Sequence, residues 1–289
     1  MWFFYSLFFA IWSAVSIFLI KRTTKYINPL PLLFILFLFA IPATFVLLQF
    51  VGGIPATTPE FYLYMFIAAL LDTVMFVSFF SAVHQSEISL LAPISSFSPV
   101  FTIIIAIFAL GEIPTFLKLV GILIVVFGAY LLNISDLKHG FLSPFKNLFS
   151  HRGVRLYLLA NFLLTITPIF QKKAIFETTP QVPLYASFIG MCLVALFLSP
   201  FTLRKALSYK KEVPSHLKTF LIYGVGTALA QLAAYTAFSL THVGYVTTVM
   251  RLSGLFSVFI GGFFLKEGRI KERLLGAGVM ILGTLILAL

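Results

Sequence analysis

The sequence predicts an all-α protein that crosses a membrane many times, and three observations support this fold class. Of the 289 residues, 60% are hydrophobic and only 10% are charged. A soluble domain carries about 25% charged residues, so this chain has too few charges to cover a folded surface in water. The mean hydropathy is +1.06, and long apolar runs alternate with short basic clusters along the chain.

Ten apolar runs have about the 20 residues that a spanning helix needs. Prolines at or near their edges, such as Pro29 and Pro59, fit helix ends, where a missing N–H costs little. Pro93, Pro99 and Pro168 lie inside runs and predict either a packing kink or an unwound stretch beside a substrate path. The expected helices are, in order, Trp2–Ile20, Leu30–Phe50, Phe61–Val83, Ile88–Leu110, Phe116–Leu132, Val154–Phe170, Leu184–Leu203, Leu217–Leu240, Val243–Leu265 and Leu274–Leu289.

The composition also excludes several classes of protein. The single cysteine, Cys192, forms no internal disulfide and by itself holds no zinc ion, so we expect neither a metal site nor a cofactor. A net charge of +11 is compatible with nucleic-acid binding, but the Lys and Arg residues lie in short clusters between apolar runs. That pattern is typical of cytoplasmic loops, so we expect the lipid bilayer, and no nucleic acid, as a partner.

The chain contains an internal repeat. An offset of 155 residues aligns Glu87–Leu132 with His242–Leu287, and an offset of 151 aligns Lys21 with Lys172 near the start of each half. The matched pairs include Ser98 and Ser253, Glu112 and Glu267, Gly121 and Gly276, and Gly128 and Gly283. We expect 1–134 to be the first five-helix repeat, 135–152 a basic cytoplasmic connector, and 153–289 the second repeat.

Five helices is an odd number, so the second repeat enters the membrane from the opposite side. Such inverted repeats are typical of secondary transporters. Sixteen of the 20 Lys and Arg residues lie in or beside the connectors after the first, fifth, seventh and ninth runs, and three lie on the opposite side. The positive-inside rule places the sixteen in the cytoplasm and both termini outside.

Glycines and glutamates near the run ends also have expected roles. Three pairs of glycines are each seven residues apart, so each pair shares a helix face that lets two backbones approach closely: Gly121 and Gly128, Gly254 and Gly261, and Gly276 and Gly283. Glu112 and Glu267 end their runs at the interface, and we interpret them as cap or loop contacts rather than transport groups.

Residues 92–112 read APISSFSPVFTIIIAIFALGE and precede the run that holds Gly121 and Gly128. This stretch resembles the EamA repeat of the drug/metabolite transporter superfamily, which has a Ser/Pro-rich fourth helix, a closing Gly-Glu and a glycine-bearing fifth helix. The first run, with Trp12-Ser13 and then Lys21, is also similar, and the resemblance covers the chain as two copies. In the second copy, Arg251 replaces Ser96.

The resemblance implies export or uptake of a small metabolite, often an amino acid or an amphipathic compound. An ion gradient or exchange would drive it. Ten-helix members are usually drawn with both termini cytoplasmic, whereas the charge distribution here predicts them outside.

Two ionisable residues inside expected helices are the main site candidates. Arg251 lies about eight residues into its run, where a charge costs about 2.5 kcal/mol or more unless it is compensated. Its planar fork of donors suits an anionic substrate group, with a structural ion pair or a backbone-carbonyl contact as the alternative. Asp72 is a candidate for a coupling proton or cation or for substrate contact, or it neutralises Arg251 or serves in helix packing.

Several polar and aromatic residues complete the candidate site. Ser95, Ser96 and Ser98 are able to bind substrate or bridge freed carbonyls, although serines also allow close helix packing. Plausible cavity walls, with interhelical hydrogen bonding or core packing as the alternative, are Trp12, Asn161, Gln231 and Tyr235.

The sequence features are compared with three possible functions. We expect a secondary active transporter in the cell membrane that moves a small metabolite by alternating access. A flippase for a lipid-linked or amphipathic group is the alternative, since a basic cytoplasmic face would gather anionic headgroups. An intramembrane enzyme is disfavoured, because no His-Glu-x-x-His occurs and Arg251 replaces the glycine that a rhomboid-like Gly-x-Ser-Gly would need. We therefore expect no enzyme activity.

Overall fold

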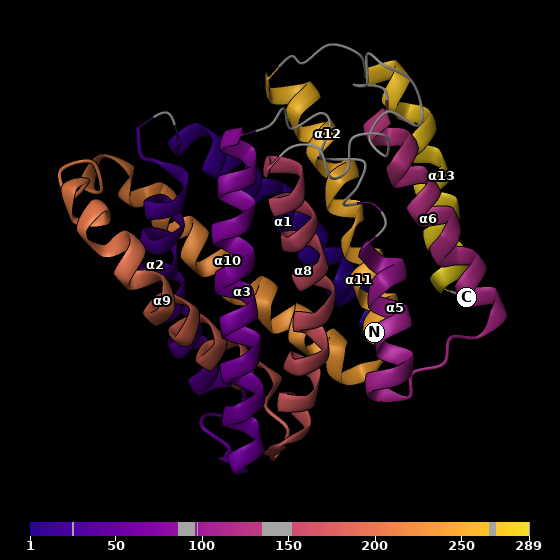
Figure 1. The fold of residues 1–289 in the computed structure, drawn as a ribbon, viewed down its shortest axis with the longest axis horizontal. Helices are drawn as coiled ribbons and strands as arrows, with labels where there is room; N and C mark the ends of the chain where they lie inside the picture. Colours follow the sequence, from indigo (N-terminus) through magenta and orange to yellow (C-terminus); the bar gives the residue numbers. More distant parts are fainter. Residues whose placement is uncertain (25, 86–95, 97, 135–151, 266–269, 289) are drawn as a thin grey trace.

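The computed structural model describes residues 1–24, 26–85, 96, 98–134, 152–265 and 270–288. This part of the chain is a bundle of helices, which confirms the all-α prediction (Figure 1). Two strands of two residues each, β1 (Ala56–Thr57) and β2 (Thr178–Thr179), pair antiparallel between two connectors. The helices are α1 (Trp2–Thr23), α2 (Pro29–Val51), α3 (Pro59–Gln85), α5 (Ser98–Leu110), α6 (Phe116–Ile134), α8 (Arg152–Phe176), α9 (Pro183–Ser208), η1 (Pro214–His216), α10 (Leu217–Leu240), α11 (Val243–Met250), α12 (Leu252–Leu265) and α13 (Ile270–Ala288).

Six helices of the described chain are long and apolar enough to cross a membrane, namely α1, α2, α3, α8, α9 and α10 together with η1. Shorter apolar helices include α5 and α6. Several expected helix starts are confirmed, because Pro29, Pro59, Pro183 and Pro214 each stand at the first position of a helix. Of the expected run Ile88–Leu110, residues 88–95 and Phe97, including Pro93, lie outside the described residues.

The prediction of one continuous helix over Val243–Leu265 is wrong, because α11 ends at Met250 and α12 begins at Leu252. At the break, the N–H of Arg251 donates to the carbonyl of Thr248 (3.1 Å) and the N–H of Gly254 donates to the carbonyl of Arg251 (3.0 Å). These bonds span three residues instead of four, so the chain winds more tightly there than in an α-helix. By contrast, Pro168 lies inside a continuous α8.

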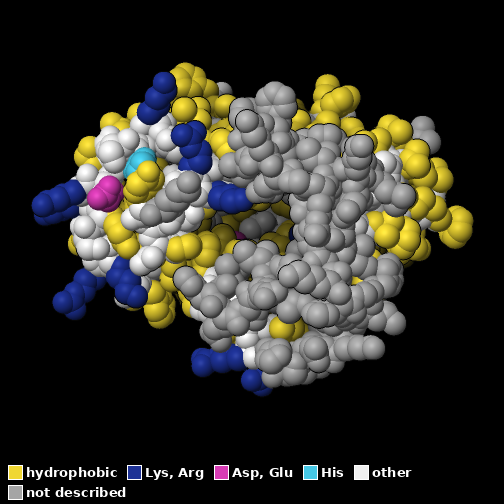
Figure 2. Space-filling model, turned by 90° about the horizontal axis from the view of Figure 1, so that it is seen from above, with side chains coloured by type: hydrophobic (Ala, Val, Ile, Leu, Met, Phe, Trp, Pro, Cys, Tyr) yellow, Lys and Arg dark blue, Asp and Glu magenta, His cyan; other side chains and the backbone are white. Residues whose placement is uncertain are grey.

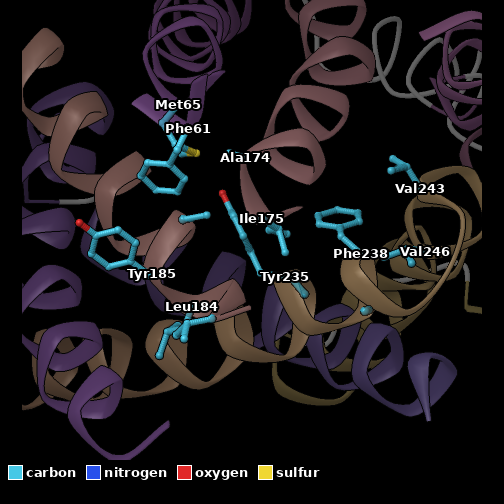
Figure 3. Close-up of a cluster of buried hydrophobic side chains, with 14 of the residues drawn as sticks. Phe61, Met65, Ala174, Ile175, Leu184, Tyr185, Tyr235, Phe238, Val243 and Val246 are labelled. Atoms are coloured by element: carbon cyan, nitrogen blue, oxygen red, sulfur yellow. The ribbon is translucent and has the colours of Figure 1, made fainter. Parts of the chain in front are cut away.

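The helices form one bundle with α6 and α13 side by side at one flank and α2 and α9 at the other (Figure 1). Between these flanks, α3 packs along α8, and α1 packs against α10 and α12. The central hydrophobic cluster draws on α2, α3, α8, α9, α10 and α11, and Figure 3 shows part of it around Tyr235. Large apolar side chains, such as Phe4 and Leu229, remain exposed on the outer surface, as expected for a surface that meets lipid.

The contact between α6 and α13 depends on glycines. A Cβ added to Gly128 would lie 2.9 Å from the carbonyl oxygen of Gly276, and a Cβ added to Gly121 would lie 3.0 Å from that of Gly283. The predicted role in close packing is therefore confirmed for these two glycine pairs. At Gly254 it is wrong, because a Cβ added there meets nothing within 4 Å. Gly121 faces Gly283 and Gly128 faces Gly276, so each helix contributes two glycines to the crossing.

The two ends of the molecule differ in charge and in the segments that they contain. At one end, here called the termini end, the ring of Trp2 lies 6.2 Å from that of Tyr245, and Lys118 Nζ donates to the carbonyl of Leu287 (2.5 Å). Both termini therefore lie at this end. The other end, here called the basic end, holds the α1–α2 and α9–α10 connections, whose Tyr26 and His216 rings are 5.0 Å apart.

We expect Gly283→Val to lower the thermal stability of the detergent-solubilised protein. A Cβ at position 283 would lie 2.7 Å from the backbone nitrogen of Val125, and backbone cannot move aside as a side chain does. Overpacking of this kind costs about 1–3 kcal/mol. Gly278→Val on the same helix is the matched control, since a Cβ there meets nothing within 4 Å. Equal midpoints of thermal unfolding for the two variants would contradict the close crossing.

Candidate functional site

A cavity of about 450 Å³ lies inside the bundle, walled by side chains from α1, α2, α3, α5, α8, α9, α10, α11 and α12. It brings together residues that are far apart in the sequence, including Asp72, Gln171, Gln231, Tyr235 and Arg251. The basic end of the molecule is hollowed near its centre, and an acidic side chain is visible inside the hollow (Figure 2).

Arg251 is placed at the cavity by the break between α11 and α12. Its guanidinium donates a hydrogen bond to the hydroxyl of Ser98, the first residue of α5. Ser98 is itself buried, so this bond joins two helices inside the bundle. Among the residues that the structure describes, Arg251 makes no ion pair. Arg251 is half-buried, and the Ser98 hydroxyl accepts from only one of the five N–H donors that an arginine carries.

Asp72 lines the same cavity from the middle of α3 and is half-buried. Its Oδ2 accepts a hydrogen bond from Nε2 of Gln171 on α8, at 3.3 Å. Asp72 and Arg251 do not pair with each other in this structure, so the static ion pair considered from the sequence is not formed. The cavity wall therefore contains one carboxyl group and one guanidinium group that do not pair with each other.

The other predicted site residues divide into two groups. Gln231 and Tyr235, both on α10, line the cavity. Ser96 is buried, and Ser95 lies outside the described residues.

Trp12 and Asn161 do not belong to the cavity wall. The indole N–H of Trp12 donates to Oγ1 of Thr227 (3.2 Å), and a Cβ at Gly226 would overlap the Trp12 ring, so this ring packs against α10. The amide of Asn161 donates to the carbonyl of Tyr157 in its own helix (2.9 Å). The polar group of Trp12 thus bonds to another helix and that of Asn161 to its own helix, instead of lining the cavity.

The apolar part of the wall is the feature that sequence reasoning missed. Four of the six methionines of the chain line the cavity, together with four phenylalanines: Met65, Met75, Met191, Met250, Phe9, Phe37, Phe76 and Phe238. Met65 is fully buried, and Figure 3 shows it with Tyr235 and Phe238. Unbranched, polarisable methionine side chains adapt to ligands of different shape. The sequence contains only six methionines, and nothing in their spacing indicates that four of them share one cavity.

Comparisons with known proteins place the chain in a family. A family model described as the EamA-like transporter family matches residues 1–134 and 151–289. A crystal structure of a protein matches with a TM-score of 0.74 over 98% of this chain and 97% of its own, at 15% sequence identity, which shows a shared fold. No curated protein sequence matches the chain. With its apolar spanning helices, the protein is an integral membrane protein. The chain belongs to the EamA-like transporter family.

Proposed function

We propose that the protein is a secondary active transporter that moves a small amphipathic metabolite, such as an amino acid, across the cell membrane by alternating access. The observation that carries this proposal is the cavity in which Asp72 and Arg251 form no ion pair with any described residue, within a wall of methionine and phenylalanine. Both side chains are half-buried, and a charge inside a membrane-spanning bundle is costly without a counter-ion, so each group is suited to a charge that arrives from outside.

The architecture in this proposal is ten transmembrane helices in two inverted repeats, 1–134 and 153–289, joined by a cytoplasmic connector. Three observations support it. The family model matches two separate ranges of similar length. The helices α6 and α13, which correspond to each other in the sequence repeat, contact each other reciprocally through glycines. Both termini lie at the same end of the molecule, as an even number of crossings requires.

In this proposal the basic end faces the cytoplasm. Exposed cations there include Arg204, Lys205, Lys210 and Lys211 around the α9–α10 connection. The positive-inside rule favours that orientation, and both termini would then be extracellular. Because the hollow of Figure 2 lies in the basic end, the structure would represent the inward-facing state.

The substrate follows from the chemistry of the wall. Arg251 would bind a carboxylate through its fork of donors, and the methionines and phenylalanines would enclose an apolar side chain. Asp72 would bind the coupling proton or cation. The bilayer and this small molecule are the partners that the proposal requires.

We expect Arg251→Gln to lower substrate flux by about 10-fold or more, because a hydrogen bond to a charged group contributes about 1.5–3 kcal/mol. Metabolite profiling of cells with and without the gene would identify the compound to follow, and flux would be measured in proteoliposomes. Arg155→Gln removes an exposed arginine from the basic end and is the matched control. Wild-type flux in Arg251→Gln, at normal membrane levels, would contradict the role of Arg251.

A lipid-linked compound that is not taken up from solution would favour the flippase.

We expect Asp72→Asn to abolish accumulation driven by an ion gradient while leaving substrate exchange measurable. An amide keeps the shape of the side chain and the contact with Gln171, but it cannot bind and release a proton or hold a cation by charge. Glu60→Gln, at an exposed acid in the first turn of the same helix, is the control. Gradient-driven accumulation that survives in Asp72→Asn would show that the coupling site lies elsewhere.

A further inference from the structure

A buried ion pair lies at the termini end of the molecule. Lys172 Nζ, near the end of α8, is 2.6 Å from Oε1 of Glu112, which follows α5. Each side chain is only 9% exposed. The pair therefore joins α8 to the segment that follows α5 at a largely buried position.

Both partners also hold the backbone of the α10–α11 connection. Lys172 Nζ donates to the carbonyl of Thr241 (2.5 Å), and Oε2 of Glu112 accepts from the N–H of Val243 (2.7 Å), the first residue of α11. The expected role of Glu112 as a cap contact is thus confirmed, because its carboxylate satisfies a free N–H at the positive end of a helix. Glu267, for which the same role is expected, lies outside the described residues. Glu112, Lys172 and the Thr241 and Val243 backbone are here called the latch.

The latch lies directly beyond the cavity. Gln171 lines the cavity and precedes Lys172 in the sequence, and Phe238 lines it three residues before Thr241. Farther along α11, whose first N–H the latch holds, Thr247 and Met250 are also wall residues. The hollow seen in Figure 2 is at the opposite, basic end.

The latch also joins the two matched regions of the chain. Glu112 belongs to residues 1–134, whereas Lys172, Thr241 and Val243 all belong to residues 151–289. Any motion that separates these regions at the termini end must break the 2.6 Å ion pair and the bond to Val243.

The energetics of a buried ion pair suit repeated opening. Coulomb attraction in the closed pair is largely offset by the cost of removing both ions from water. When the pair opens into an aqueous path, both ions are hydrated again, so the closed and open arrangements differ little in free energy. A ligand in the cavity is then able to shift the balance between them.

We propose that the latch holds the cavity closed at the termini end in this state and must open for the cavity to reach that side of the membrane. The proposal rests on the proposed function, because it assigns the latch to one of the two alternating-access states. It adds residues outside the cavity that would control access without contacting the substrate.

The test measures access to the cavity and needs no substrate. In a Cys192→Ser background, Thr247→Cys places one thiol on the cavity wall. A membrane-impermeant maleimide is added to oriented proteoliposomes on the side that the termini face. We expect slow labelling in this background and an increase of at least about fivefold in Glu112→Gln and in Lys172→Met, as the population shifts toward the open state.

The choice of Glu112→Gln and two further variants, Lys173→Met and Lys172→Arg, make the result specific to the ion pair. Glu112→Gln keeps an oxygen that is able to accept from Val243 N–H, so it separates loss of the ion pair from loss of the helix cap. Lys173→Met removes the neighbouring lysine, which lies over the Tyr64 ring instead of in the latch, and should label as slowly as the background. Lys172→Arg keeps the charge and should restore most of the slow labelling.

Unchanged labelling from the termini side in monodisperse Glu112→Gln and Lys172→Met protein would overturn the latch. Faster labelling from both sides of the membrane would also overturn it, because that result indicates general loosening of the bundle. Faster labelling from the termini side alone, in a protein that moves no compound, would support the latch and remove the transport proposal.

Discussion

The cost of placing a charge where water is scarce governs this structure more than any other constraint. The bundle of helices satisfies its own backbone groups, as a bilayer demands, and leaves few ionisable side chains inside. Each of them has a specific environment. Lys172 and Glu112 compensate each other and a helix terminus. Asp72 and Arg251, in contrast, form no ion pair among the described residues, and their hydrogen-bond partners include the neutral side chains of Gln171 and Ser98. The same physical penalty thus distinguishes the paired charges of Lys172 and Glu112 from Asp72 and Arg251, to which we assign a charged ligand in the proposed function.

Much of the fold followed from the sequence because one physical rule, the apolar length of a spanning helix, determines most of it. Helix α10 begins and ends at the expected residues, and α2 and α9 begin one residue before them. The break at Arg251 was missed, because hydropathy averages over a window and contains no information on three-residue hydrogen bonds. At this turn Arg251 also contacts Ser98 of another helix, a tertiary contact that a hydropathy pattern does not reveal.

The candidate site was less predictable than the fold. An ionisable residue inside an apolar run is visible in the sequence, so Asp72 and Arg251 could be identified as candidates directly. The orientation of Trp12 and Asn161 was not available from the sequence, because it depends on Thr227 and on a backbone carbonyl of the same helix. The partnership of Glu112 with Lys172 was hidden for a similar reason. Sixty residues separate them in the chain, and neither position reveals which helix end the other approaches.

The distribution of methionine offers a practical consequence. Four of the six methionines surround the cavity, and Met280 lies at the α6–α13 crossing, where its backbone nitrogen meets Gly128. Isotope labelling of methionine methyl groups would therefore place most of the resonances of a simple spectrum at the cavity and one at the helix crossing. One experiment would then report both the binding of a molecule in the cavity and any movement at the α6–α13 crossing, without any engineered probe.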